Sequence, residues 1–320
     1  NYHQLDYGPV SAASYSPGGM TLLRVGNPAG GGVLIASEVK TAVLYKTTLY
    51  KTTARLPVYE AGETLAGAIA WLGVAANVQA GTPYFIALTR DETLSGEWTL
   101  NNSNLNLTLE GAGETRTINA AGVPASRPVI SLNAGTLTLG NNLTLDGGGR
   151  AGRFIGIEGG AALNLTGATL TGNNSGAVSV GYGGFTMSGG AITGNSTTSV
   201  GGGVGVSSGW FTMTGGVISG NSASHTNGGG GVFVSGGVFT MTGGVISGNT
   251  APRGGGVRLY SNDPFSVAGG EISGNTATNG PGFGAQVFQM GSSNHYIDGA
   301  ITPSMTVVNW AAPGDPYWDD

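Results

Sequence analysis

FTMTGGVISGN occupies residues Phe211–Asn221 and recurs unchanged at Phe239–Asn249. Looser copies begin at Phe185 (FTMSGGAITGN) and at Phe265 (FSVAGGEISGN). The asparagines that end the copies, together with Asn173 before them, are separated by 22, 26, 28 and 26 residues. A repeat of this length is the signature of one structural unit stacked on the next. The short apolar bursts at alternate positions predict that each unit is a coil of a parallel β-helix.

Each position of the repeat has a predicted role in such a coil. Side chains alternate across a strand, so the Phe and the Met of each copy (Val267 in the last copy) face inward, while the Thr or Ser between them faces solvent. Stacking in register therefore predicts a Phe column and an Ile column, made of Phe185, Phe211, Phe239 and Phe265, and of Ile192, Ile218, Ile246 and Ile272. The paired glycines suit tight corners. The repeated amide predicts a hydrogen-bonded ladder of Asn173, Asn195, Asn221, Asn249 and Asn275, which satisfies buried backbone groups.

The chain is therefore expected to be all-β, with roughly nine three-strand coils that form a rod about 40 Å long at the usual strand spacing. Before the regular repeats, strands are expected at Tyr84–Leu88, Leu105–Leu109, Val129–Leu132, Leu137–Leu139 and Leu143–Leu145. Five regions follow from these patterns: an arm (1–20), a small β element (21–62), a capping helix (63–80), the β-helix (81–300) and a C-terminal tail (301–320). In the β element, the apolar bursts are Leu22–Val25, Val33–Ala36 and Val43–Thr53.

The helix is predicted at Glu63–Ala76, where the apolar period changes. Leu65, Ile69, Leu72 and Ala76 fall at i, i+4, i+7 and i+11, which is one face of an amphipathic helix. The first coil of a β-helix exposes unpaired backbone groups and an open core, and a covering helix would protect both. We expect Trp71 to pack at or near that end of the core.

Two segments carry a family resemblance: GGVFTMTGGVISGNTAPRGGGVRLY and GWFTMTGGVISGNSASHTNGGGGVFV. They resemble the glycine-rich repeats of bacterial surface proteins with right-handed parallel β-helices, in the broad pectate-lyase-like superfamily. The resemblance covers about residues 84–300 and implies a right-handed coil. Because that superfamily includes lyases, hydrolases, adhesins and structural proteins, the resemblance implies a fold more sharply than an activity.

Composition narrows the class of protein. Of 320 residues, 62 are glycine and only 9% are charged, and the net charge is −5 without basic runs, which argues against nucleic-acid binding. There is no cysteine, and no apolar run approaches the length of a membrane span. The resemblance implies a bacterial protein that is extracellular or on the cell surface, and because the sequence starts at Asn1 and not at Met, we expect that a leader has been removed.

The charged residues do not predict an active site. A glycosidase needs two carboxylates at a defined separation. The only charged residues between 160 and 300 are Arg253, Arg258, Asp263, Glu271 and Asp298. Glu271 has no acidic counterpart in the preceding coils. The densest charged group is Asp146, Arg150, Arg153 and Glu158, for which surface ion pairs are the expected role. A metal site built from His3, His225 and His295 is not expected, because the three lie in different regions. We expect no catalysis, no metal and no cofactor.

Two surface features leave binding functions open. Thr212-Met-Thr214 and Thr240-Met-Thr242 resemble the hydroxyl arrays of ice-binding surfaces, although the pattern ends at Ser266-Val-Ala268 and Thr also suits any exposed strand. Outward-facing aromatic side chains are expected to be available for stacking on sugars or on another protein; they are Trp210, Phe233 and Tyr260.

The leading hypothesis is a non-catalytic extracellular structural protein that assembles through its termini or rod ends into a fibre or surface layer. Its main partner would be a second copy of the chain. The first alternative is an adhesin or carbohydrate-binding surface protein, with glycans or host or neighbouring surface proteins as partners. The second alternative is a polysaccharide lyase or hydrolase.

Overall fold

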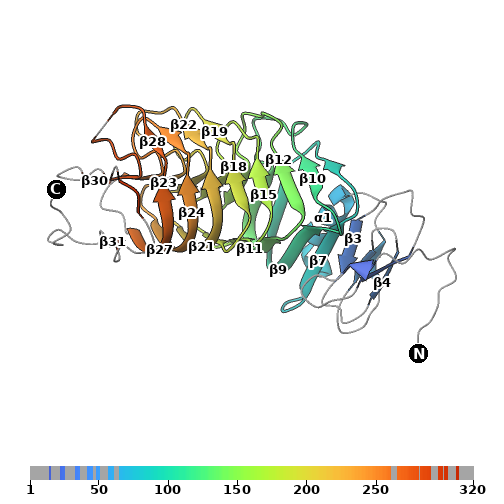
Figure 1. Cartoon of the computed structure of the whole chain (residues 1–320). Helices are drawn as coiled ribbons and strands as arrows, with labels where there is room; N and C mark the ends of the chain where they lie inside the picture. The colour runs from blue at the N-terminus through green and yellow to red at the C-terminus, as the bar shows by residue number, and fades with distance from the viewer. Residues whose placement is uncertain are drawn as a thin grey trace.

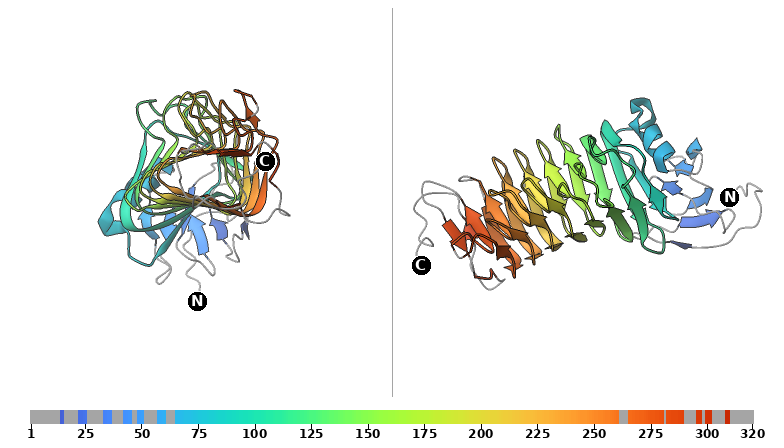
Figure 2. Two further views of the ribbon diagram at one scale, coloured as in Figure 1. Left: turned by 90° about the vertical axis from the view of Figure 1, so that its left-hand side faces the viewer. Right: turned by 90° about the horizontal axis from the view of Figure 1, so that it is seen from above.

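In the computed structural model, the described residues are 65–260, 265–280, 282–289, 295–297, 299–301 and 308–309, together with the backbone of six short strands before residue 61. The chain forms a rod-like parallel β-solenoid of about eight turns, with α1 (Leu65–Gly73) near one end and β27 (Phe265–Ser273) near the other (Figure 1). Viewed along the rod, successive coils superimpose on one another (Figure 2). The all-β parallel β-helix predicted from the repeat is thus confirmed.

Three walls run along the solenoid, each with eight parallel rungs. Wall A contains the first part of β9 (Trp98–Gly111) and of β11 (Ile130–Leu139), then β13 (Ile155–Ile157), β16 (Val178–Val180), β20 (Val204–Val206), β23 (Val232–Val234), β26 (Val257–Leu259) and β29 (Val287–Gln289). Wall B contains β7 (Pro83–Leu88), the second part of β9 and of β11, β14 (Ala162–Leu165), β17 (Gly184–Met187) and the first part of β21 (Trp210–Ser219), β24 (Val238–Ser247) and β27 (Phe265–Ser273).

Wall C contains β8 (Glu92–Thr93), β10 (Arg116–Asn119), β12 (Leu143–Asp146), β15 (Thr169–Thr171), β18 (Ala191–Thr193) and the second part of β21, β24 and β27. A short fourth sheet lies in the loops that follow wall C; it comprises β19 (Ser196–Thr197), β22 (Ser222–Ala223), β25 (Thr250–Ala251) and β28 (Thr276–Ala277). The strands expected between residues 84 and 145 are found in β7, β9, β11 and β12.

Aligned apolar columns fill the interior. Phe185, Phe211, Phe239 and Phe265 are in register and buried, with ring centroids 4.7, 4.8 and 5.5 Å apart along the column. The Ile column is buried as well. In the preceding coil Leu163 occupies the Phe position. The first two ring spacings match the spacing of parallel strands, so Phe185, Phe211 and Phe239 stack as directly as their backbones do, whereas the ring of Phe265 is tilted by 30° from that of Phe239.

The asparagine ladder is present and buried. The Oδ1 atom of each Asn from Asn195 onward accepts a hydrogen bond from the backbone N–H of the Asn one coil earlier, at 2.9–3.1 Å. From Asn195 to Asn249, the Nδ2 group also donates to the next Oδ1, at 2.9–3.0 Å. Nδ2 of Asn221 donates in addition to the carbonyl of Ile192 in the preceding coil. The amides of Asn195, Asn221 and Asn249 therefore each tie three coils together, which satisfies polar groups of the corner.

The ladder ends on a different residue, Gln286. Its Oε1 accepts from the backbone N–H and the Nδ2 of Asn275, at 3.3 and 2.8 Å. Gln286 stands where earlier coils have Gly256 and Gly231, by the register of β26 and β29. At Gly256 an added Cβ would lie 2.8 Å from Nδ2 of Asn275, so a side chain would collide with the ladder. After Asn275 no further Asn follows in the described part of the ladder, and Gln286 fills that place.

Helix α1 (Leu65–Gly73) lies at the N-terminal end of the solenoid (Figure 2) and is followed by the 3-10 helix η2 (Ala75–Asn77). Its Leu65, Ala68, Ile69 and Leu72 are buried in the main core, and Trp71 packs against that core from a partly buried position. The prediction of a helical face reaching Ala76 was wrong: the α-helix stops at Gly73, and Ala76 is exposed. Glycine favours the end of a helix because it lowers the cost of leaving the helical conformation.

Short strands precede the helix. β1 (Ser14–Tyr15), β2 (Leu22–Val25) and β4 (Ala42–Tyr45) form one sheet, and β5 (Thr48–Tyr50) pairs with β6 (Pro57–Glu60). β3 (Val33–Ala36) pairs antiparallel with β7 and so covers the first edge of wall B. β1 falls within the predicted arm; the rest of residues 1–20, including His3, lies outside the described residues.

The C-terminal end is closed by the chain itself. β30 (His295–Ile297) pairs antiparallel with β29, and β31 (Val308–Asn309) pairs antiparallel with β27. Ile301 forms an antiparallel bridge with Ile272. These pairings cover the last rung of walls A, B and C in turn. The chain reverses direction here instead of adding a further coil, which is why there are about eight turns and not the nine expected. Part of the predicted tail thus belongs to the closure.

Candidate functional site

Arg150 belongs to the densest charged group, but it is buried and forms no ion pair in the described part of the chain. Its guanidinium donates to five backbone carbonyls, those of Val123, Pro124, Arg127, Gly152 and Arg153. Four of these bonds, all but the one to Arg127, measure 2.8–3.2 Å. Burial lowers the pKa of Arg150 from its ordinary value. The guanidinium of Arg150 thus holds the backbone of two successive loops together.

The other members of the group have ordinary surface roles. Arg153 and Glu158 form a partly exposed ion pair with a nitrogen–oxygen distance of 3.8 Å. Asp146 accepts a hydrogen bond of 2.8 Å from the backbone N–H of Gly148 and so stabilises a turn. The prediction of surface ion pairs therefore holds for Arg153 and Glu158, and it was wrong for Arg150, because the side chain turns inward to the carbonyls.

The remaining acidic and histidine side chains do not converge either. Glu271 follows Val245 in register and accepts a hydrogen bond from the hydroxyl of Ser273 on its own strand. His225 is exposed in a loop, where its Nδ1 accepts from the N–H of Asn227 at 3.1 Å. Nowhere in the described ranges do three or more His, Asp or Glu side chains gather in a way that could hold a metal ion. Asp263, Asp298 and the side chain of His295 lie outside what is described.

Phe233 and Tyr260 were predicted to be exposed aromatic contacts. Tyr260 is exposed, but Phe233 is buried, and their rings are tilted at a centroid distance of 6.3 Å. Glycine-rich segments pass directly over this outer face of wall A: an added Cβ on Gly229 or Gly254 would lie 2.9 or 2.8 Å from Cβ of Arg258. The prediction for Phe233 was therefore wrong, since strand alternation alone does not show which outer face a loop covers.

Arg258 is buried under the same segments, one rung after Phe233. Its guanidinium carbon lies 4.5 Å from the ring centroid of Phe288, and Nη1 donates to the carbonyl of Leu259 at 2.8 Å. Burial, followed by the charge of Arg253, lowers the pKa of Arg258 to about 10. The aromatic and cationic side chains of this face are thus used to pack the rod itself.

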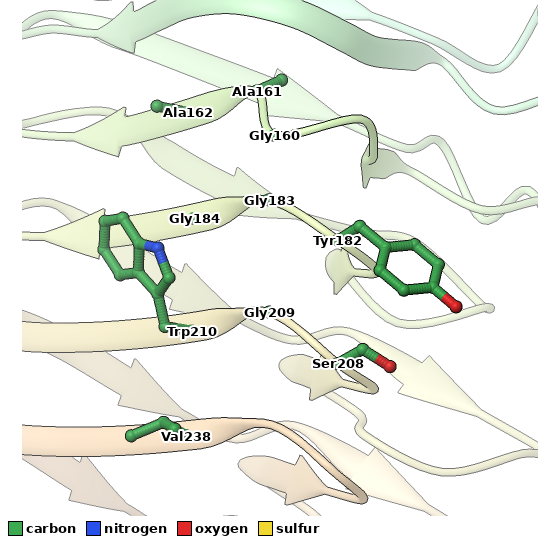
Figure 3. Close-up of a pocket in the computed structure, with 10 residues that line it drawn as sticks. All are labelled: Gly160, Ala161, Ala162, Tyr182, Gly183, Gly184, Ser208, Gly209, Trp210 and Val238. Atoms are coloured by element: carbon green, nitrogen blue, oxygen red, sulfur yellow. The ribbon is translucent and has the colours of Figure 1, made fainter.

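Trp210 remains exposed, and the structure adds an aromatic neighbour that the sequence reasoning missed. Trp210 and Tyr182 line one shallow groove of about 310 Å³, at the corner where wall A turns into wall B. Figure 3 shows the two side chains on either side of Gly183 and Gly209. The other lining residues are Gly160, Ala161, Ala162, Gly184, Ser208 and Val238.

Small residues in the register explain how Trp210 is placed. Along the outer face of wall B, the column runs from Ala162 through Gly184 to Trp210 and then to Val238. An added Cβ at Gly184 would lie 2.0–2.7 Å from three atoms of the six-membered ring of the indole. The indole thus occupies the space left by the absent side chain one rung earlier.

Tyr182 stands at the tip of the corner between β16 and β17, with Gly181 before it and Gly183 after it. Its carbonyl accepts a hydrogen bond of 3.1 Å from the N–H of Gly160 in the preceding coil. By the same register Ser208 takes the position of Tyr182 in the next coil. A comparison of the corners, in addition to the strands, would have revealed this aromatic residue in the sequence.

Comparison with known protein families, curated proteins and solved structures gave no match. No helix among the described residues has the length and apolar character needed to span a membrane.

Proposed function

We propose that the chain is a non-catalytic structural protein on the outside of a bacterial cell, where copies assemble into a fibre or surface layer. We also propose a kinship with the glycine-rich repeats of bacterial surface proteins in the pectate-lyase-like superfamily. The observation that carries the structural role is that the buried arginines and the ladder asparagines of the rod bind the rod itself. Arg150, Arg258 and the asparagines from Asn173 to Asn275 bind backbone or neighbouring coils.

The two ends of the rod differ as routes to assembly. At the C-terminal end, the last rung of each wall is already paired with the chain's own residues, so a second copy could add strands there only by displacing them. At the N-terminal end, two small sheets made from β1, β2, β4, β5 and β6 stand beyond the first coil (Figure 1). Exposed sheet edges readily accept strands from another chain. We therefore assign one self-contact to the N-terminal end, and a fibre or layer uses a second contact elsewhere on the rod.

Sedimentation velocity over a range of concentrations, together with negative-stain electron microscopy, tests the assembly. We expect oligomers or filaments that grow with concentration. A single monomeric species at every concentration would contradict self-assembly.

Introduced cysteines then locate the contact, because the chain has no cysteine of its own. Ala66→Cys places a thiol on the exposed face of α1, whereas Thr278→Cys places one on the last coil. We expect disulfide-linked dimers from the first variant and very few from the second. The opposite result would move the contact to the C-terminal end.

One specific observation favours a second candidate, a carbohydrate-binding or adhesive surface protein. It is the pair of exposed aromatic side chains, Tyr182 and Trp210, in one uncharged groove.

A further inference from the structure

The groove beside Trp210 presents aromatic surface that the rod does not use. Tyr182 is 73% exposed and Trp210 is 45% exposed, which makes them the two most exposed aromatic side chains among the described large hydrophobic residues. A folded protein normally buries such rings, and exposed aromatic residues that share one concave surface mark a binding site more often than scattered ones do.

The floor between the two rings is almost free of side chains. Gly183 and Gly209 lie between Tyr182 and Trp210, with Gly160 and Ala161 one coil earlier (Figure 3). A ligand can therefore approach the backbone closely while it contacts a ring on each side. The packing of the coils accounts for this flat floor, because an added Cβ on Gly183 or Gly209 would lie 2.4 or 2.1 Å from the carbonyl oxygen of the residue one coil earlier.

The size of the groove argues for a small ligand. A volume of about 310 Å³ lies at the lower end of the range for small-molecule sites. A specific protein partner would need to bury about 1,200–2,000 Å² in total, far more than the surface around two side chains and a glycine floor can provide.

The chemistry of the lining selects among small ligands. No charged residue lines the groove, so nothing there would offset the desolvation of an ionic ligand. The flat faces of Trp and Tyr suit the C–H face of a hexopyranose ring, and the hydroxyl of Ser208 can bond to its polar rim. Two residues farther along the same strands, Thr186 and Thr212 face outward as well, in register with each other.

We propose that the groove between Tyr182 and Trp210 binds a neutral glycan, with a hexopyranose ring packed against the aromatic side chains. The partly buried hydroxyl column on wall B lies beside the groove, where it supplies donors and acceptors for the neighbouring sugar of a longer chain. Trp210 is the main stacking surface, and Gly184 is a positioning residue that holds the indole in place. This site does not depend on the proposed self-assembly, and either proposal can fail without the other.

The test is isothermal titration of the full chain with cellohexaose, laminarihexaose, maltohexaose and chitohexaose, with oligogalacturonate as the acidic comparator. We expect saturable binding of at least one neutral oligosaccharide and no tighter binding of the acidic one. Trp210→Ala and Tyr182→Ala should each weaken that binding by about tenfold or more, as expected for an aromatic anchor of a small site. Tyr260→Ala, an exposed tyrosine outside the groove, should leave it unchanged.

A second variant separates the position of the indole from its presence. Gly184→Ala keeps both rings but places a methyl group where the indole lies, so binding should weaken while the melting temperature of the rod changes little. The proposal is overturned if none of the four neutral probes binds to the wild-type chain, if oligogalacturonate alone binds, or if binding survives in both aromatic variants. Circular dichroism of each variant confirms that the fold is retained.

Discussion

The early and late coils satisfy their buried backbone groups by different means. In the coil that contains Arg150, a single guanidinium donates to the five carbonyls named above. From Asn195 to Asn249, one amide per coil does comparable work and also bonds to the amide of the next coil. The two devices meet at Gly152, whose carbonyl accepts from Nη1 of Arg150 at 2.9 Å and from Nδ2 of Asn173 at 3.0 Å.

The difference teaches how a solenoid can change from irregular to repetitive. The long side chain of arginine can donate to several carbonyls in loops of different length, but its hydrogen bonds are confined to the two loops that it joins. The side chain of asparagine is shorter, but it can recur at the same position of every repeat, because every coil offers it the same hydrogen-bond partners. The repeat therefore becomes regular once the ladder begins, and the coil before it needs a residue of its own.

The largest expected effect comes from removing the arginine. Arg150→Ala deletes five donated hydrogen bonds in a buried site, and we expect the unfolding free energy to fall by about 3–5 kcal/mol. Arg150→Lys should recover only part of this loss, because one ammonium cannot span the same carbonyls. Urea denaturation followed by circular dichroism measures the change. Arg153→Ala, which removes a partly exposed ion pair, is the control and should cost at most about 0.5 kcal/mol. Equal losses in Arg150→Ala and Arg153→Ala would refute the role given to Arg150.

A smaller effect is expected from one rung of the ladder. Asn221→Ala removes two bonds that its Nδ2 donates and two that its Oδ1 accepts, which should cost about 2–3 kcal/mol. Asn174→Ala is the matched control, since Asn174 is exposed and stands outside the ladder. The same denaturation experiment compares the two. If Asn221→Ala proved no more damaging than Asn174→Ala, the ladder would be a by-product of the fold and not one of its supports.

The smallest effect is expected at the end of the ladder. Gln286→Met keeps the volume of the side chain but removes the acceptor for Asn275, at a cost of about 1–2 kcal/mol. The loss should be local, so hydrogen exchange should speed up at Asn275 and Thr276 and stay unchanged near Asn195. Uniform acceleration along the rod would instead show that the last rung contributes to global stability.

The repeat predicts most of the rod, because its constraints are local and are copied from coil to coil. Phe211 and Phe239 share a sequence environment, so the position of one follows from that of the other. Features that occur once were harder to predict. The burial of Phe233 depends on a glycine-rich loop that crosses the wall, and Arg150 looked like a surface charge because its partners are carbonyls, which every residue has.

The candidate groove was half predicted. Trp210 followed from strand alternation, whereas Tyr182 lies in a corner, where alternation does not apply. Its relation to Trp210 depends on Gly184 and on the register between coils, and that register became clear only in the structure. The closure of the C-terminal end was missed for a related reason: antiparallel strands at His295–Ile297 and Val308–Asn309 do not carry the repeat.

The replacement of glycine by Gln286 also bears on how long such a rod can be. Every interior coil makes the same ladder hydrogen bonds to the coil before it and to the coil after it. The ladder therefore does not limit the number of interior coils. Only the coil with Gln286 in place of glycine ends the series. Duplicating the segment between Asn221 and Asn249 would extend the molecule by about 4.8 Å and leave both ends as they are. The length of the rod is therefore set by the number of repeats encoded in the gene, and it can change without a change in the structure of either end.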